Sequence, residues 1–492
     1  MSLQMMSVLF FVAYLIFVTF VAWWSGRKTS GEAADVDYYL GGHSTPIVVL
    51  AFSYVTSSVS ATAFMGDPGV MSRIGWPYYW IVIAIIPSLI LPAVLLMRRL
   101  RQQAGALGSL TIPEYLGQRF DSRALRLIIA GVISIFYIFP LVAQFKGGAI
   151  LLESFTGISF DMGLVIITAI IIFYVIAGGL RSVAWTDFVQ GFPMLIICMA
   201  LIFVSLSAVG GFSGLEEKLA AIDPNMLLIT EPSDKPDAQM TVSGIIGNFV
   251  FWCVIFVSQP YLCSKFLALP NVSRKTIGVF LITTLVLTVI YNSFYIVGLP
   301  GRVLFPDADP DHLTVTMAIN LLPKGMAAMM MIGIFAAMMS TATSILLVIG
   351  QAIGRDFYSK TINPKATPER EVLVTRIAVT VVAIICMLFN YVNPPKLLSI
   401  FLYLGLSGIG SCIGVPLITG IISDKGTKQG AIASSITGPV AYMVFTYAIG
   451  INFWVSCLLA VLASALVMIV VSHFTAAPRE VEAMPSVAQE TE

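Results

Sequence analysis

Thirteen apolar stretches, each about as long as a helix that crosses a bilayer, dominate this sequence. The hydrocarbon core of a membrane needs about 20 apolar residues per helix, and lipid leaves no water to satisfy irregular backbone. We therefore expect thirteen membrane helices. The stretches cover residues 5–25, 46–70, 74–97, 127–152, 160–179, 183–208, 242–260, 277–300, 324–352, 374–392, 397–422, 430–450 and 452–474.

The composition excludes a soluble globular protein. Charged residues make up only 11% of the chain and hydrophobic residues 58%, whereas a soluble domain carries about 25% charged residues. Too few charges are left to cover a solvated surface. The net charge of +1 gives no sign of a nucleic-acid partner. The sequence predicts an all-α integral membrane protein that crosses the cell (inner) membrane many times.

Lysine and arginine are divided unevenly between the two sets of loops, and cytoplasmic loops carry the excess in membrane proteins. Six lie in the loops after even-numbered stretches. Twenty lie in the loops after odd-numbered stretches or in the C-terminal tail, and Lys146 belongs to neither set. The N-terminus is thus predicted outside and the C-terminus in the cytoplasm, which requires an odd number of spans.

The loops are too short for a separate extramembrane domain. We expect one transmembrane domain over residues 1–475 and a polar, disordered cytoplasmic tail over residues 476–492. No nucleophile–base set, zinc-protease motif or phosphate-binding loop occurs in the sequence. An enzyme is therefore not expected.

Two of the apolar stretches contain clusters of hydroxyl side chains. Polar groups in a membrane helix are costly unless satisfied, so clusters indicate a solute or ion pathway. The alternative is that these hydroxyls bond to their own helix or pack helices together. The first cluster comprises Ser53, Thr56, Ser57, Ser58, Ser60 and Thr62, ahead of Gly66-Asp67-Pro68-Gly69; the second comprises Ser340, Thr341, Thr343 and Ser344.

Charged and amide side chains in other stretches add candidate contacts. Asp187 lies about one turn inside its stretch, where it either binds a cation or complements a helix N-terminus. Lys146, beside Gln144, lies too deep to reach the membrane surface, so it either binds an anionic substrate or pairs with an internal carboxylate such as Glu153. Asn248 and Trp252 precede Pro260, which we expect to break its helix.

Four motifs, in order along the chain, resemble those of the sodium:solute symporter family. They are Asp37-Tyr38-Tyr39-Leu40-Gly41-Gly42; Thr111-Ile112-Pro113-Glu114-Tyr115-Leu116 with Arg119-Phe120; Gly178-Gly179 with Trp185-Thr186-Asp187 and Gln190; and Gly420-Ile421, Lys425, Gly430-Ala431 and Gly438. The resemblance covers nearly the whole chain.

The resemblance implies a LeuT-like core, a five-plus-five inverted repeat over about residues 46–208 and 242–422, in which each half opens with a broken helix. It implies Na⁺ as the coupling ion. The family pattern assigns one sodium to Thr56, Val59, Ala337, Ser340 and Thr341, and a possible second sodium to Asp187, Ser340, Thr343 and Ser344.

The chain is accordingly expected to be a sodium-coupled secondary active symporter that imports a small organic solute. A carboxylate of the monocarboxylate or pantothenate type fits Lys146 best, and proline or another amino acid is the alternative. A transporter-like membrane sensor is an alternative from a different class. The residues expected to contact the solute are Ser57, Ser58, Ser60, Thr62, Gln144, Lys146, Asn248 and Trp252.

Overall fold

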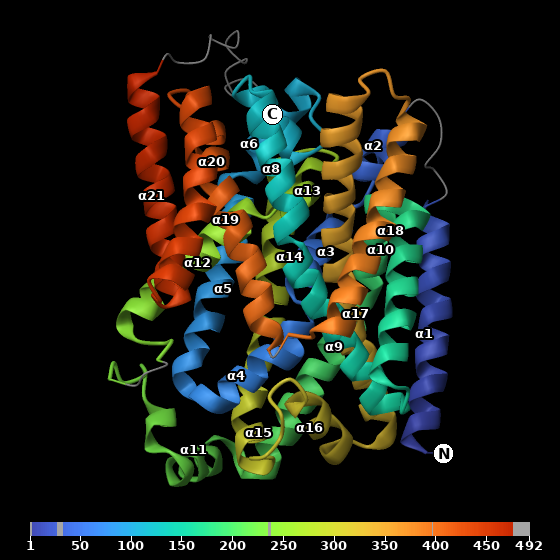
Figure 1. Ribbon diagram of the computed structural model, residues 1–492. Coiled ribbons are helices and arrows are strands. Elements are labelled where there is room, and N and C mark those ends of the chain that lie inside the picture. The colour runs from blue at the N-terminus through green and yellow to red at the C-terminus, as the bar shows by residue number, and fades with distance from the viewer. Residues whose placement is uncertain (1, 27–32, 235–237, 396, 476–492) are drawn as a thin grey trace.

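Helices make up all the regular structure of the described chain, which is a computed structural model covering residues 2–26, 33–234, 238–395 and 397–475 (Figure 1). The predicted tail, residues 476–492, lies outside the described residues. The α-helices are α1 (Leu3–Gly26), α2 (Ala34–Leu40), α3 (Ile47–Ser58), α4 (Asp67–Ile74), α5 (Trp80–Leu95), α6 (Met97–Leu107), α7 (Ile112–Arg119), α8 (Arg123–Phe136), α9 (Ile138–Thr156), α10 (Phe160–Val209), α11 (Gly211–Ile222), α12 (Val242–Ser258), α13 (Pro260–Leu267), α14 (Arg274–Asn292), α15 (Gly298–Leu304), α16 (Leu313–Leu321), α17 (Lys324–Gln351), α18 (Pro368–Val392), α19 (Leu398–Ile422), α20 (Lys428–Met443) and α21 (Phe453–Phe474).

Short 3₁₀ or π segments connect several of these helices. They are η1 (Gly41–His43), η2 (Thr62–Gly66), η3 (Trp76–Tyr79), η4 (Pro224–Leu227), η5 (Ser293–Val297), η6 (Ala352–Ile362) and η7 (Val444–Ala448).

By length and composition, ten helices among the described residues can cross a membrane, and two bent helix pairs raise that number to twelve. The remaining predicted stretch, residues 160–179, contains the shorter apolar helix Phe160–Ile176. In Figure 1, α1 begins at the lower face of the bundle and α21 ends at the upper face. Because the start of α1 and the end of α21 lie on opposite faces, the chain crosses the bundle an odd number of times between them. The prediction of an all-α membrane protein is confirmed.

Two spans are broken near their middle. Helix α3 meets the helical segment Thr62–Ile74 at a bend of 54°, and α12 meets α13 at 47°. The second break lies at Gln259, whose backbone is extended because the following Pro260 disfavours a helical conformation there. These breaks open the two segments of the predicted inverted repeat, and the repeat itself stays a prediction.

Helix α10 contains a third change of direction, at Gly179. Its φ of 56° and ψ of −154° lie outside the helical region. A Cβ atom at this position would lie 2.2 Å from the carbonyl oxygen of Tyr38, so a side chain there would clash with backbone. Gly179 thus separates the two stretches that the sequence predicted over residues 160–179 and 183–208.

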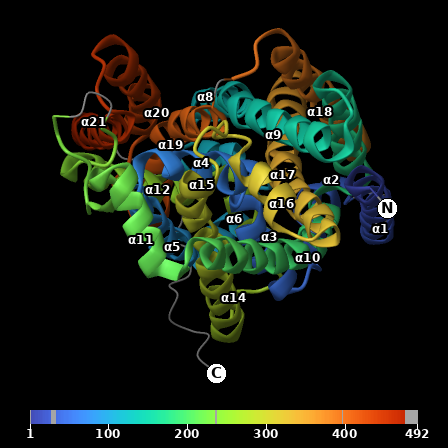
Figure 2. The same cartoon turned by 90° about the horizontal axis from the view of Figure 1, so that it is seen from below.

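Helix α17 forms the centre of the bundle. In the span that it opens, Lys324–Ile362, 94% of the most apolar window is buried, against 28% for α1 and α21 at the periphery. Figure 2 shows α17 in the interior, where it packs against α3, α9 and α10. Its hydroxyl side chains therefore face other helices and not lipid.

Candidate functional site

The two hydroxyl clusters meet where α3 crosses α17. Ser340 Oγ donates to the backbone carbonyl of Thr56 at 2.9 Å, and Thr341 Oγ1 donates to that of Ser57 at 2.9 Å. Both hydroxyls also reach the carbonyl of Ala337, at 3.0 and 3.3 Å. These groups are buried, so the interior brings together oxygen atoms that lie some 280 residues apart in the chain.

The break in α3 supplies further backbone oxygens near this crossing. Helix α3 ends at Ser58, and the next residue, Val59, is extended with φ of −94° and ψ of 99°, so the regular helical pairing of carbonyls stops here. The carbonyls of Thr56 and Ala337 and the hydroxyls of Ser340 and Thr341 form an oxygen-only donor set that suits a hard cation. The residues present therefore fit the first predicted sodium site.

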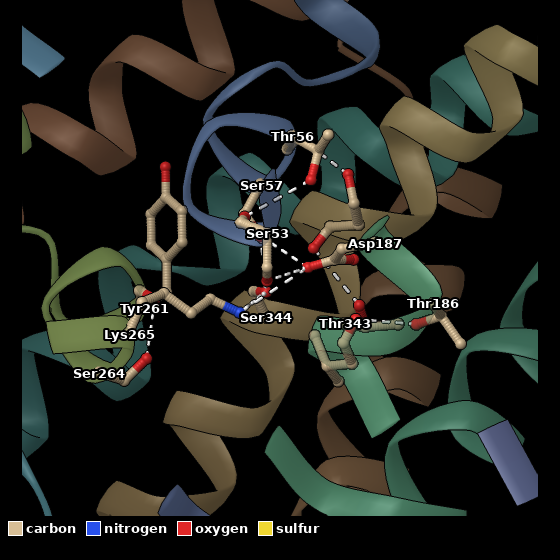
Figure 3. Close-up of polar contacts among 12 residues, drawn as sticks. Ser53, Thr56, Ser57, Thr186, Asp187, Tyr261, Ser264, Lys265, Thr343 and Ser344 are labelled. Atoms are coloured by element: carbon tan, nitrogen blue, oxygen red, sulfur yellow. Dashed lines mark hydrogen bonds and ion pairs between the residues drawn. The ribbon is translucent and has the colours of Figure 1, made fainter. Parts of the chain in front are cut away.

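The second predicted sodium set is arranged around Asp187 on α10. Asp187 Oδ2 accepts hydrogen bonds from Ser53 at 2.5 Å and Ser57 at 3.1 Å, and Ser57 bonds to Ser344 at 3.0 Å (Figure 3). The structure thus joins Asp187 to Ser344 through α3. Thr343 Oγ1 instead donates back to the carbonyls of Met339 and Ser340 on its own helix.

A cationic side chain that the sequence analysis did not single out lies in this second set. The Lys265 ammonium donates to Ser344 Oγ at 3.2 Å and lies 3.7 Å from Asp187 Oδ2, with both charged side chains fully buried (Figure 3). In the count of loop lysines and arginines, Lys265 belongs to the loop after the stretch 242–260, which the sequence predicts to be cytoplasmic. The sequence does contain a signal for a buried Lys265. Apolar residues continue beyond Pro260, and Leu262 and Phe266 lie before and after the lysine in α13.

Several predicted substrate contacts have buried polar atoms without a hydrogen-bond partner among the described residues. They are Nε2 of Gln144, both side-chain polar atoms of Asn248, and the indole nitrogen of Trp252. Gln144 Oε1 accepts a hydrogen bond from the backbone nitrogen of Ala61, at the break after α3, at 2.9 Å. Unpartnered buried polar groups are rare in folded proteins, which favours a role in binding a ligand.

The remaining hydroxyls of the first cluster have local partners. Ser58 donates to the carbonyl of Val55 at 2.6 Å, and Ser60 and Thr62 bond to each other. Their predicted contact with a solute stays a prediction.

Aromatic rings and one buried carboxylate surround Trp252. The Trp252 ring stacks on Phe256 and meets the ring of Tyr403 edge-on. Tyr403 and Tyr78 each donate a hydroxyl hydrogen bond to the buried carboxylate of Asp67, at 2.5 and 3.0 Å. The sequence analysis quoted Asp67 only as part of a break and assigned it no role. Its two tyrosine partners lie on other helices, so spacing along the chain could not reveal them.

Lys146 has an internal carboxylate partner. Its ammonium lies 2.7 Å from Asp311 Oδ2, and the Asp311 side chain is 1% exposed. Glu153, which the sequence suggested as a partner, is exposed to the surroundings instead. The physical reason is that a largely buried ammonium needs a nearby anion, and the loop ahead of α16, which carries Asp311, folds over this lysine.

A second ion-pair network lies at the upper face. Arg355 contacts the carboxylates of Glu114 at 2.7 Å, Glu371 at 2.9 Å and Asp35 at 3.1 Å. Burial by itself would raise the pKa of Glu114, but Arg355, the backbone N–H of Leu110 and Lys360 together outweigh burial and lower that pKa below the ordinary value of 4.5. The network joins α2, α7, η6 and α18 at the end of the central helix.

Comparison with known proteins identifies the family of this chain. The model of the sodium:solute symporter family matches residues 38–438 of the chain. The high-affinity proline transporter PutP of Bacillus subtilis is 28% identical over 473 residues, which are 94% of this chain and 96% of the relative. The sodium/pantothenate symporter of Haemophilus influenzae is 26% identical over 439 residues, 88% of this chain and 89% of the relative.

Solved structures show the same fold. A Na⁺-coupled sialic acid symporter in a substrate-bound outward-open state superposes with a TM-score of 0.82 at 19% identity, covering 97% of this chain and 100% of the other. Mhp1, a transporter of the nucleobase-cation-symport-1 family, has a TM-score of 0.59 at 17% identity, covering 90% and 96%.

Proposed function

This chain belongs to the sodium:solute symporter family, and from that premise we propose that it imports a small organic carboxylate together with sodium. It is a transporter and not an enzyme. The observation that carries the proposal is the pair of contacts from Ser340 and Thr341 to the carbonyls of Thr56 and Ser57. They support an oxygen-only donor set between the broken span of α3 and the deeply buried α17.

Sodium would be held by the carbonyls of Thr56, Val59 and Ala337 and by the hydroxyls of Ser340 and Thr341. When bound, the ion supplies a positive charge that satisfies oxygens from both helices at once. The hydroxyls and carbonyls of this site now bond directly to one another across the interface of α3 and α17. A site shared between two helices is sensitive to their relative position, which is how ion binding can be coupled to a change of access.

The solute would lie against unpartnered donors on α9 and on α12, the first part of the second broken span. Gln144 Nε2, Asn248 Nδ2 and Trp252 Nε1 are N–H donors, and a carboxylate accepts hydrogen bonds from such groups. The relatives are described as transporters of proline or pantothenate, and both of these solutes carry a carboxylate. Proline is the alternative substrate, because it would use the same donors.

Purified chain in proteoliposomes tests this proposal. Radiolabelled pantothenate, a short monocarboxylate and proline are offered in turn with an inward sodium gradient, and one of them should accumulate above its external concentration. A potassium gradient of equal size is the control. Equal accumulation of the solute without sodium on either side would contradict sodium coupling.

We also propose that the upper face of Figure 1 is cytoplasmic, because the excess of lysine and arginine lies in the loops of that face. Single cysteines at Lys365, in the loop between η6 and α18, and at Asp307, between α15 and α16, would report the orientation. In intact cells an impermeant maleimide should label the cysteine at 307 and spare the one at 365. The reverse pattern would invert the topology.

A further inference from the structure

Lys265 on α13 is a fully buried ammonium beside a set of oxygen atoms that belong to three other helices. It projects from α13 toward Asp187 of α10 and Ser344 of α17, and Ser53 and Ser57 of α3 bond to the same carboxylate oxygen (Figure 3). A buried lysine needs an anion and oxygen acceptors for its three N–H donors. Asp187 provides the anion here and Ser344 provides one acceptor.

The same oxygens are those that a second sodium would need. Hard cations take carboxylate and hydroxyl oxygens, and the family pattern predicts a second ion at Asp187, Ser340, Thr343 and Ser344, of which Lys265 contacts the first and the last. The ammonium lies within 3.2 Å of Ser344 Oγ and 3.7 Å of Asp187 Oδ2. A sodium ion on the same two ligands would be within a few ångströms of a like charge in a region of low dielectric constant, which is strongly unfavourable. The residues present therefore do not fit a second sodium.

We propose that the Lys265 ammonium is a tethered cation that takes the place of a second sodium, so that the chain binds one sodium ion per molecule. The inference rests on the proposed sodium coupling at the first site. Because the ammonium is covalently attached, it neutralises Asp187 without drawing an ion from the gradient. Each transport cycle then moves one sodium ion, whereas a carrier with two sodium sites moves two.

An ordinary structural salt bridge is the competing interpretation, and it makes a different prediction. A bridge that only holds helices together leaves an unsatisfied carboxylate when the lysine is removed, and the protein loses stability at every sodium concentration. A tethered cation leaves a carboxylate that two hydroxyls, of Ser53 and Ser57, already contact, with the Ser344 hydroxyl bonded to Ser57 beside them. Sodium should then enter the freed position and restore stability.

The test is equilibrium binding of radioactive sodium to the purified full chain, with melting temperature measured on the same samples. Wild type should bind one ion and Lys265→Met should bind two, with a melting temperature that rises with sodium more steeply than in wild type. Lys265→Arg keeps the charge and should bind one. Lys324→Met, which removes an exposed lysine at the start of α17, should behave as wild type.

Two results would overturn the inference. One is a wild type that binds two ions and loses one of them in Asp187→Asn. The other is a folded Lys265→Met that binds no additional sodium. If Lys265→Met does not fold, Lys265→Ser, which adds a hydroxyl to the set, is measured in its place. Absence of all sodium binding in wild type would instead refute the proposed function, and a gain of one ion in the lysine variants would still support the tethered cation.

Discussion

The Lys146 ammonium lies 2.7 Å from the carboxylate of Asp311 and so connects the middle of α9 to the loop ahead of α16, 165 residues further along the chain. The other oxygen of Asp311 accepts a hydrogen bond from the backbone nitrogen of Leu398 at the start of α19, at 3.5 Å. One carboxylate thus ties three segments together near the lower face. Burial raises the pKa of Asp311, although Lys146 opposes that rise.

The first prediction follows from this ion pair. Lys146→Met and Asp311→Asn should each lower the stability of the protein by about 3–5 kcal/mol, because each breaks an ion pair whose carboxylate is fully buried. Substrate affinity should change little. Thermal unfolding and substrate binding are measured on the same purified samples, with Glu153→Gln, an exposed carboxylate on the same helix as Lys146, as the control. A tenfold loss of affinity for anionic substrates in Lys146→Met alone would show that this lysine binds the substrate.

The second prediction concerns the first sodium site. Ser340→Ala and Thr341→Ala should each raise the sodium concentration for half-maximal uptake by roughly fivefold to tenfold, since losing one polar contact costs about 1–1.5 kcal/mol. Ser134→Ala is the matched control, because its hydroxyl bonds only to Ala130 on its own helix. An unchanged sodium dependence in both variants, at normal expression, would refute the assignment.

The third prediction concerns the solute. Trp252→Phe removes the unpartnered indole nitrogen and keeps most of the ring, so it should weaken solute binding by about tenfold or less, the value of one hydrogen bond. Sodium binding should be unaffected. Trp454→Phe removes an equally buried, unpartnered nitrogen on α21 and should leave solute affinity unchanged. Equal effects of the two substitutions would argue against a substrate role for Trp252.

The fourth prediction concerns Asp187 and Lys265. Asp187→Asn leaves a buried ammonium facing a neutral amide and should destabilise the protein by about 3–5 kcal/mol. The double variant Asp187→Asn with Lys265→Met removes both charges and should recover a large part of that loss. Thermal unfolding of the two single variants and the double variant gives the coupling energy. Simple additivity of the two single effects would contradict a direct ion pair.

The fifth prediction is a pH dependence at the upper face. The folded pKa of Glu114 lies below its ordinary value of 4.5, so its stabilising contribution is present above about pH 4.5 and is lost as pH falls through the folded pKa. Glu114→Gln should therefore lower the melting temperature at neutral pH and reduce the further loss on acidification. Glu153→Gln, at an exposed position, is the control and should follow wild type at each pH.

Local patterns in the sequence were enough to predict the membrane helices and their breaks. Hydrophobicity over about 20 residues decides whether a segment can cross the bilayer, and Pro260 and Gly179 act on the backbone next to them. The hydroxyl clusters were also visible, because polar residues in an apolar helix are rare and costly. Family membership followed from motifs that are likewise local.

Only the tertiary structure decided which polar groups face one another. The sequence places Lys265 in a cytoplasmic loop, whereas in the structure α13 carries it into the interior beside Asp187. Lys146 pairs with Asp311 and not with Glu153. Thr343 turned back to its own helix while Ser344 reached Asp187 through Ser57. The reason is that an ion pair or a hydrogen bond depends on distances of a few ångströms between distant segments, and those distances are set by how the helices pack.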